Sequence, residues 1–129
     1  MEAKATAKFV RYTPRKTNQV LTLIRGKEVS KALEVLYFLP KSSATLVEKV
    51  LKSAIANSGS IKDFSGFKVK EAWVGAGPTL KRMRPGPQGR GMPIKKRTVH
   101  LTIVVTDENV LEKKNKRSKS IKSVDSKNK

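Results

Sequence analysis

The sequence contains no cysteine, which excludes disulfide bridges, thiolate metal sites and cysteine nucleophiles. It has a single histidine, His100, and ten acidic residues without a paired spacing. Catalysis by His100 would need a positioned partner, and a metal site would need more ligands than this chain offers. We therefore expect no catalytic residue, no metal, no cofactor and no enzymatic activity.

Long apolar runs and aromatic side chains are also scarce. No stretch approaches the roughly 18 apolar residues of a membrane span, and the N-terminus lacks the apolar core of a signal peptide. We therefore expect a cytoplasmic protein with no membrane partner. Aromatic residues make up 5% of the chain, which leaves few platforms for base stacking. Hydrophobic residues at 37% of 129 positions are enough for one modest core.

Positive charge is what the chain has in excess. Its formal net charge is +19, which favours binding to polyanions. The stretch from Gly77 to Thr98 holds seven Lys and Arg residues, no acidic residue, four prolines and four glycines. Proline removes backbone donors and glycine permits close backbone approach, so this segment cannot build a core of its own. Its order must come from an acidic partner, and nucleic acid is the partner that the sequence favours.

Apolar residues at three- and four-residue spacing predict three helices in the first half of the chain. The first begins with the Thr13 hydroxyl as its N-cap and stops at Gly26. The second is capped by Ser30 and turns Tyr37 toward the core. The third covers about residues 42–58.

Strand-like alternation follows over residues 67–76 and 98–106, and a shorter strand is predicted over 5–12. In the 67–76 strand we expect Val69 and Glu71 on one side and Trp73 packed in the core or against the sheet. The two later strands should pair antiparallel and carry the basic segment as a hairpin.

The fold class is therefore α+β: three helices packed on a small antiparallel sheet with a long protruding β-hairpin. Residues 1–107 are expected to form one globular RNA-binding domain that includes the hairpin at about 77–98. Residues 108–129 are rich in Lys, Ser and Asn and are expected to form a basic, flexible C-terminal tail.

The candidate phosphate contacts are basic residues of the first strand, the first helix and the hairpin, with His100 at the hairpin base. They are Lys8, Arg11, Arg15, Lys16, Arg25, Lys81, Arg82, Arg84, Arg90, Lys95, Lys96, Arg97 and His100. Met83 and Met92 flank the hairpin tip and either pack against bases and sugars or only fill gaps.

Three segments resemble a known family: RKTNQVLTLIRGKEVSKALEVL, KSAIANS and GPTLKRMRPGPQGRGMPIKKRTVHLTIVV. They are similar to the bacterial-type large-ribosomal-subunit proteins numbered twenty-two, over about residues 5–107. The resemblance implies a body on the subunit surface and a hairpin that threads between rRNA segments and lines the nascent-polypeptide exit tunnel. It implies large-subunit rRNA of several domains, neighbouring large-subunit proteins and the nascent polypeptide as partners, with a role in subunit assembly and no enzymatic activity.

The resemblance also assigns positions. Arg15, Arg25 and Lys27 match the basic N-terminal positions of the family, so Lys27 joins the candidate rRNA contacts. The tunnel-lining tip would consist of Met83, Arg84, Pro85, Gly86, Gln88, Gly89 and Arg90. The tip departs from the family pattern, in which Met-Pro is followed by Arg-Ala-basic-Gly-Arg-Ala.

The alternative interpretation is an architectural DNA-binding protein, which would use the basic ribbon as an arm with a proline wedge. Such arms usually belong to dimers. The body of this chain shows no evident dimerisation stripe, and we expect no homo-oligomer.

Overall fold

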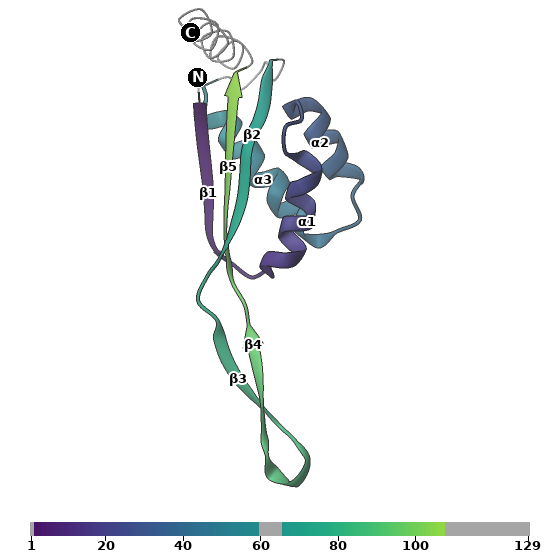
Figure 1. Cartoon of the computed structure of the whole chain (residues 1–129), viewed down its shortest axis with the longest axis vertical. Coiled ribbons are helices and arrows are strands. Elements are labelled where there is room, and N and C mark those ends of the chain that lie inside the picture. The colour runs from purple at the N-terminus through teal and green to yellow at the C-terminus, as the bar shows by residue number, and fades with distance from the viewer. Residues whose placement is uncertain (1, 60–65, 108–129) are drawn as a thin grey trace, which may run out of the picture.

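The computed structural model of the chain describes residues 2–59 and 66–107, and Figure 1 shows their arrangement. Their elements are, in order, β1 (Glu2–Val10), α1 (Pro14–Ile24), α2 (Val29–Phe38), α3 (Ser42–Asn57), β2 (Phe67–Ala76), β3 (Leu80–Pro85), a 3₁₀ turn (Pro87–Gly89), β4 (Gly91–Lys96) and β5 (Val99–Asp107). Strands β1, β5 and β2 form an antiparallel sheet in that order, while β3 and β4 form a separate two-stranded hairpin. This arrangement confirms the predicted α+β class. The predicted tail, 108–129, lies outside the described residues.

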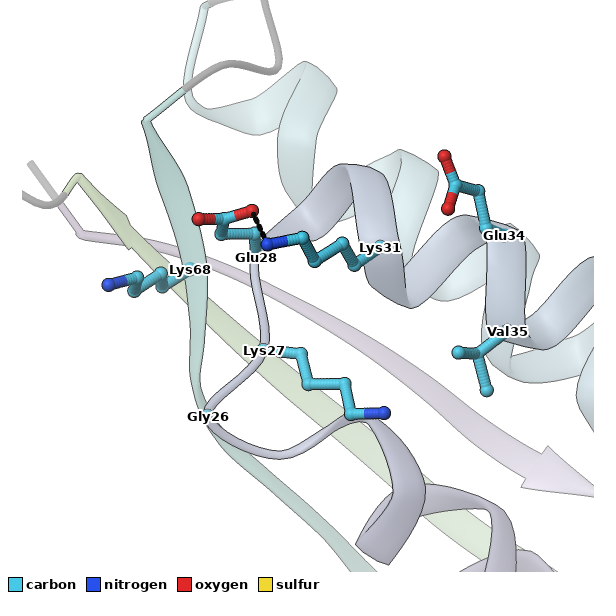
Figure 2. A pocket seen from close by; sticks show the side chains of 7 residues that line it. All are labelled: Gly26, Lys27, Glu28, Lys31, Glu34, Val35 and Lys68. Carbon is cyan, nitrogen blue, oxygen red and sulfur yellow. Dashed lines mark ion pairs between the residues drawn. The ribbon is translucent and has the colours of Figure 1, made fainter.

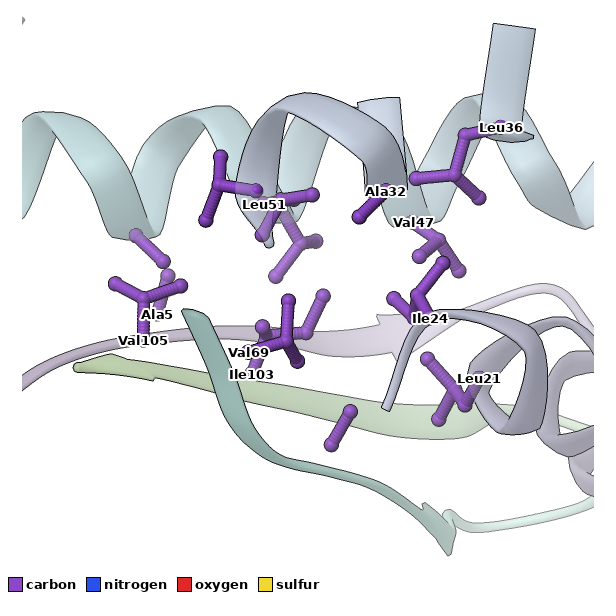
Figure 3. Packing of buried hydrophobic residues seen from close by; sticks show 14 of the residues in the cluster. Ala5, Leu21, Ile24, Ala32, Leu36, Val47, Leu51, Val69, Ile103 and Val105 are labelled. Atoms are coloured by element: carbon purple, nitrogen blue, oxygen red, sulfur yellow. The ribbon is translucent and has the colours of Figure 1, made fainter. Parts of the chain in front are cut away.

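The strict alternation of β5 explains its central position. Val99, Leu101, Ile103 and Val105 are fully buried on one face of the sheet, which packs against the helices. Their partners on that face are small residues of β1 and apolar residues of β2. Helices α1, α2 and α3 lay their own apolar faces on this surface, and Figure 3 shows the resulting core. The core fixes the sheet from which the hairpin projects.

Helix α1 begins and ends where predicted, with Thr13 at its N-cap and Pro14 at its first position, but the predicted hydroxyl cap is absent. Gly26 follows the helix with a φ of +73°, and its N–H donates a hydrogen bond of 2.9 Å to the Val69 carbonyl of β2. At the other end, Thr13 occupies the N-cap position without a side-chain cap, and its buried Oγ1 has no hydrogen-bond partner among the described residues. The predicted Thr13 cap is therefore wrong.

Two predictions for α2 are also wrong. The helix starts at Val29, with Glu28 in the N-cap position, so Ser30 does not cap it. Tyr37 is 78% exposed and makes an edge contact with Phe38. The buried residues of this short helix are spaced by three and four positions and end at Leu36. Tyr37 comes one position later, about 100° around the helix from that face.

A bulge in β2 overturns the predicted orientation of its middle. Val69 pairs with Val105 but Glu71 pairs with Val104, so Lys70 is an extra residue. A bulge moves every following side chain to the opposite face. Glu71 is therefore exposed on the face away from the helices, and Trp73, which lies on the same face, is 42% exposed and outside the core.

Candidate nucleic-acid interface

The hairpin of β3 and β4 projects from the end of the sheet, away from the helices (Figure 1). Its cross-strand pairs are Leu80–Lys96, Lys81–Lys95, Arg82–Ile94, Met83–Pro93, Arg84–Met92 and Pro85–Gly91. All side chains of the two strands are exposed except that of Ile94, which is half-buried. The hairpin therefore has no core, and it presents its charges to whatever surrounds it.

The pairing sorts the side chains onto two faces, because directly opposed residues of an antiparallel pair point the same way. The first face, called here the mixed face, consists of Leu80, Arg82, Arg84, Met92, Ile94 and Lys96. Each of its cross-strand pairs joins one cation to one apolar residue, so like charges are not directly opposed. Three cations thus follow one another along the mixed face, with apolar contact area between them.

The second face, called here the lysine-pair face, consists of Lys81, Met83, Pro85, Gly91, Pro93 and Lys95. Lys81 and Lys95 oppose each other near the base, which destabilises the isolated ribbon. Toward the tip this face carries no charge, and the Met83 side chain is 70% exposed. The two faces therefore offer different surfaces to a partner.

A compact turn closes the tip. The Gly86 N–H donates to the Arg90 carbonyl at 2.7 Å, and the Arg90 N–H donates to the Pro87 carbonyl at 3.3 Å. Gln88 and Gly89 both have left-handed backbones, with φ of +57° and +68°. This defined turn fixes the Arg90 backbone between the end of the ribbon and the start of β4.

The base of the hairpin is closely packed. The Gly77 N–H donates to the Thr98 carbonyl at 2.9 Å, and the Thr98 hydroxyl donates to the Pro78 carbonyl at 2.6 Å. A Cβ at Gly77 would lie 2.5 Å from Thr98 Oγ1 and 3.2 Å from Nε2 of His100. Glycine is therefore required at position 77, where the two strands of the hairpin leave the sheet.

The fold brings the hairpin base to the start of α1. Arg97 joins Thr13, Pro14, Arg15 and Lys16 around a cavity of about 440 Å³. The first turn of α1 has no acidic residue and no side-chain cap, so its backbone amides add to the positive potential of the three cations. Two adjacent predicted phosphate contacts, Arg15 and Lys16, thus meet a third, Arg97, that is distant in sequence.

His100 lies on β5 beside this base. Its Nδ1 accepts a hydrogen bond of 3.1 Å from the Phe9 N–H, and the two rings meet edge to face at 4.7 Å between centroids. Phe9 has a φ of +56° at the bulge of β1. The Nδ1 atom is thus engaged within the protein, and Nε2 is the nitrogen left for an external partner.

Other predicted contacts lie apart from the hairpin. Arg25 donates from Nε to the Ala72 carbonyl at 2.7 Å and from Nη2 to Oδ1 of Asn18 at 2.8 Å. Its guanidinium therefore ties α1 to β2 within the body. Lys8 and Arg11 are exposed near the bulge that ends β1.

Lys27 lines a separate pocket of about 620 Å³ with Gly26, Glu28, Lys31, Glu34, Val35 and Lys68, shown in Figure 2. Lys31 pairs with Glu28 at 2.9 Å, and this hydrogen bond lowers the pKa of the Glu28 carboxyl. Both signs of charge line this pocket, so it suits a polyanion less well than the hairpin does.

The sequence analysis missed Lys4 and Trp73 as a pair. The Lys4 ammonium lies 5.6 Å from the centre of the Trp73 ring, across β5. Only the bulge in β2 places this ring on the open side of the sheet, and no local pattern reveals the bulge.

The described parts of the chain contain neither a metal-binding cluster nor a helix that could span a membrane. No cluster of three or more His, Cys, Asp or Glu residues there could hold a metal ion. No helix in residues 2–59 and 66–107 is both long and apolar enough to cross a membrane.

The chain is similar to known proteins over most of its length. The family model described as ribosomal protein L22p/L17e matches residues 5–106. The large ribosomal subunit protein uL22 of Endomicrobium trichonymphae is 76% identical over 107 residues, covering 83% of this chain and 93% of that protein. The proteins of the same name from Clostridium acetobutylicum and Macrococcus caseolyticus are 50% and 52% identical. Those two alignments cover 83% and 85% of this chain, and 98% and 90% of the respective relatives.

Proposed function

Since the chain belongs to the ribosomal protein L22p/L17e family and is thus a structural constituent of the large ribosomal subunit rather than an enzyme, we propose that it binds large-subunit rRNA through its hairpin and the adjoining start of α1. The protein is located in the cytoplasmic ribosome. Family membership sets aside the architectural DNA-binding alternative.

The observation that carries the proposal is the hairpin itself. The hairpin is an exposed two-stranded ribbon with seven basic residues, no acidic residue and no core. It needs bound anions to offset the repulsion between its positive charges. Folded rRNA supplies phosphates from several directions, and Arg side chains can grip them in pairs. The hairpin threads between rRNA segments, the Arg15–Lys16–Arg97 cluster holds a phosphate at its base, and binding of several segments assists subunit assembly.

The lysine-pair face supports a second role for the tip. Near the tip this face is uncharged and exposes Met83, so it offers a smooth wall rather than a phosphate-binding surface. We assign the uncharged tip half of this face to the lumen of the polypeptide exit tunnel, where it lies beside the nascent polypeptide, while the mixed face and the Lys81–Lys95 pair lie against rRNA. The body, which ends at about residue 107, remains at the subunit surface beside neighbouring large-subunit proteins.

A crosslinking experiment tests the tunnel-lining role. Replacing Met83 with the photocrosslinker p-benzoylphenylalanine places the probe at the tip, and irradiation of ribosomes with a stalled nascent chain should join the protein to that chain. Tyr37, at 78% exposure in the body, is the matched control position and should give no nascent-chain product. Nascent-chain crosslinks from Tyr37 but not from Met83 would refute the placement of the tip.

A shortened hairpin tests the division between body and ribbon. Because Leu80 lies opposite Lys96, replacing residues 81–95 by Asn-Gly closes the ribbon with a two-residue turn and leaves the Gly77–Thr98 contact intact. In a sucrose gradient, the intact protein should stay with the large subunit at high salt, and the shortened protein should leave it at lower salt. Equal salt resistance of the two proteins would contradict rRNA binding by the hairpin.

A further inference from the structure

The three-stranded sheet has a second face, which the three helices leave open (Figure 1). The pairing of the strands places Thr6, Thr102 and Trp73 side by side in one row across this face. The hydroxyls of Thr6 and Thr102 lie 3.2 Å apart, and Thr102 is buried. Trp73 therefore lies beside two short side chains on the edge strand β2, with 42% of its own area exposed.

The Trp73 ring has no aromatic partner within the described residues, where the ring pairs are Phe9–His100 and Tyr37–Phe38. Its described neighbour is a cation, the Lys4 ammonium at 5.6 Å. An exposed indole beside a flexible cation is a typical surface for an unpaired base, because the base stacks on the ring and the cation moves to its phosphate.

The charges on this face become uniformly positive toward the hairpin. Glu71 is one row farther from the hairpin than Trp73, and Glu2 is farther still and pairs with Lys70 at 2.8 Å. From the row of Trp73 to the hairpin base, the described side chains on this face include the exposed Lys8 and the half-buried His100, and none is acidic. The surface thus runs without interruption into the proposed rRNA interface.

We propose that the open face formed by Lys4, Thr6, Lys8, Trp73 and His100 binds an unpaired nucleotide of large-subunit rRNA. The base stacks on Trp73, and the flanking phosphates contact Lys4 and Lys8. This inference rests on the proposed rRNA binding and adds a site of a different kind, since the hairpin contacts the backbone whereas this face recognises a base that has left its helix.

Trp73 provides its own probe, because it is the only tryptophan of the chain. The full-length protein is titrated with a twelve-nucleotide oligoadenylate and with a ribose-phosphate oligomer of the same length that lacks bases. Both carry the same phosphates, so anisotropy of a labelled end should show that both bind. Only the oligoadenylate should quench the Trp73 emission.

Variants separate stacking from attraction by charge. Trp73→Leu should weaken oligoadenylate binding by roughly tenfold, the typical effect of losing one stacked base, and leave binding of the abasic oligomer unchanged. Trp73→Phe keeps an aromatic ring and should weaken oligoadenylate binding less than Trp73→Leu does. Tyr37→Leu removes an aromatic residue of higher exposure on the helical side and should change neither affinity.

The outcomes distinguish the two proposals. Binding of both oligomers with no quenching, or equal quenching by both, would overturn the stacking site and leave hairpin binding intact. In that case the open face would be a surface for a neighbouring protein. Failure of both oligomers to bind at low salt would refute the proposed RNA binding itself.

Discussion

Removing the three cations of the mixed face should lower the salt dependence of RNA binding by a fixed amount. The change is the triple variant Arg82→Gln, Arg84→Gln and Lys96→Gln. All three side chains are exposed and each is paired across the ribbon with an apolar residue, so the variant keeps the hairpin pairing and loses only charge.

The magnitude follows from the number of cations. Seven cations that each neutralise one phosphate give a log–log salt slope of about −5 to −6, and three fewer contacts reduce its size by about 2 to 3. Between 50 and 200 mM salt, binding of the original protein should therefore weaken roughly a thousandfold or more, and that of the variant roughly a hundredfold. Filter binding to a fragment of large-subunit rRNA across this range measures both slopes.

The control removes the same charge from the helices, by changing Lys31, Lys49 and Lys52 to Gln. Lys31 and Lys52 already pair with Glu28 and Glu48, at 2.9 and 2.6 Å. We expect this control to change the slope much less than the hairpin triple does. If the two triples lower the slope equally, net charge rather than hairpin geometry governs binding, and the reasoning is wrong.

Three further changes test the body and the hairpin base. Gly77→Val should destabilise the fold by about 1–3 kcal/mol in urea unfolding, because its side chain meets the Thr98 hydroxyl; an unchanged midpoint would contradict the packing described. Arg25→Ala should cost about 1–3 kcal/mol, because it removes a charged hydrogen bond to a backbone carbonyl, and it should leave the salt slope of RNA binding nearly unchanged; a large loss of slope would make Arg25 an rRNA contact. The hydrogen bond to Glu2 raises the pKa of Lys70, so its contribution to stability is present below the unfolded pKa of lysine and is lost as the pH rises through the folded value. Glu2→Gln should remove this alkaline component from a series of melting temperatures, and an identical pH profile would show that the pair contributes nothing.

Much of the fold could be predicted because its periodic patterns are strong. The alternation of β5 and the spacing in α3 gave the strand and the helix with nearly the observed bounds. The conformation of β2 could not be predicted in the same way, since the extra residue Lys70 is visible only from the pairing of this strand with β5. Tyr37 was misplaced because α2 is short, and in a short helix one position decides whether a side chain lies inside or outside.

Part of the candidate site could likewise be predicted from the sequence, and part could not. Composition alone identifies the cations of the hairpin, because a segment so rich in Lys, Arg, Gly and Pro cannot build a core and needs anions around it. Composition does not reveal which cations meet, and only the fold brings Arg97 to the first turn of α1. Nor does composition show which cations form hydrogen bonds within the protein, as Arg25 does with the Ala72 carbonyl.

Each of the two strands of the hairpin is also an edge strand of its sheet. Each has one partner among the described residues, so each leaves a row of outward backbone groups that could pair with the hairpin of another copy. Every copy must pass through the cytoplasm before its subunit is assembled, and a neutral ribbon would then be a starting point for aggregation. Pro85 and Pro93 interrupt these edges, and the Lys and Arg side chains repel a second ribbon. The residues proposed to bind RNA after assembly thus also keep the free protein apart from its copies before assembly, so loss of these charges should reduce both affinity and solubility.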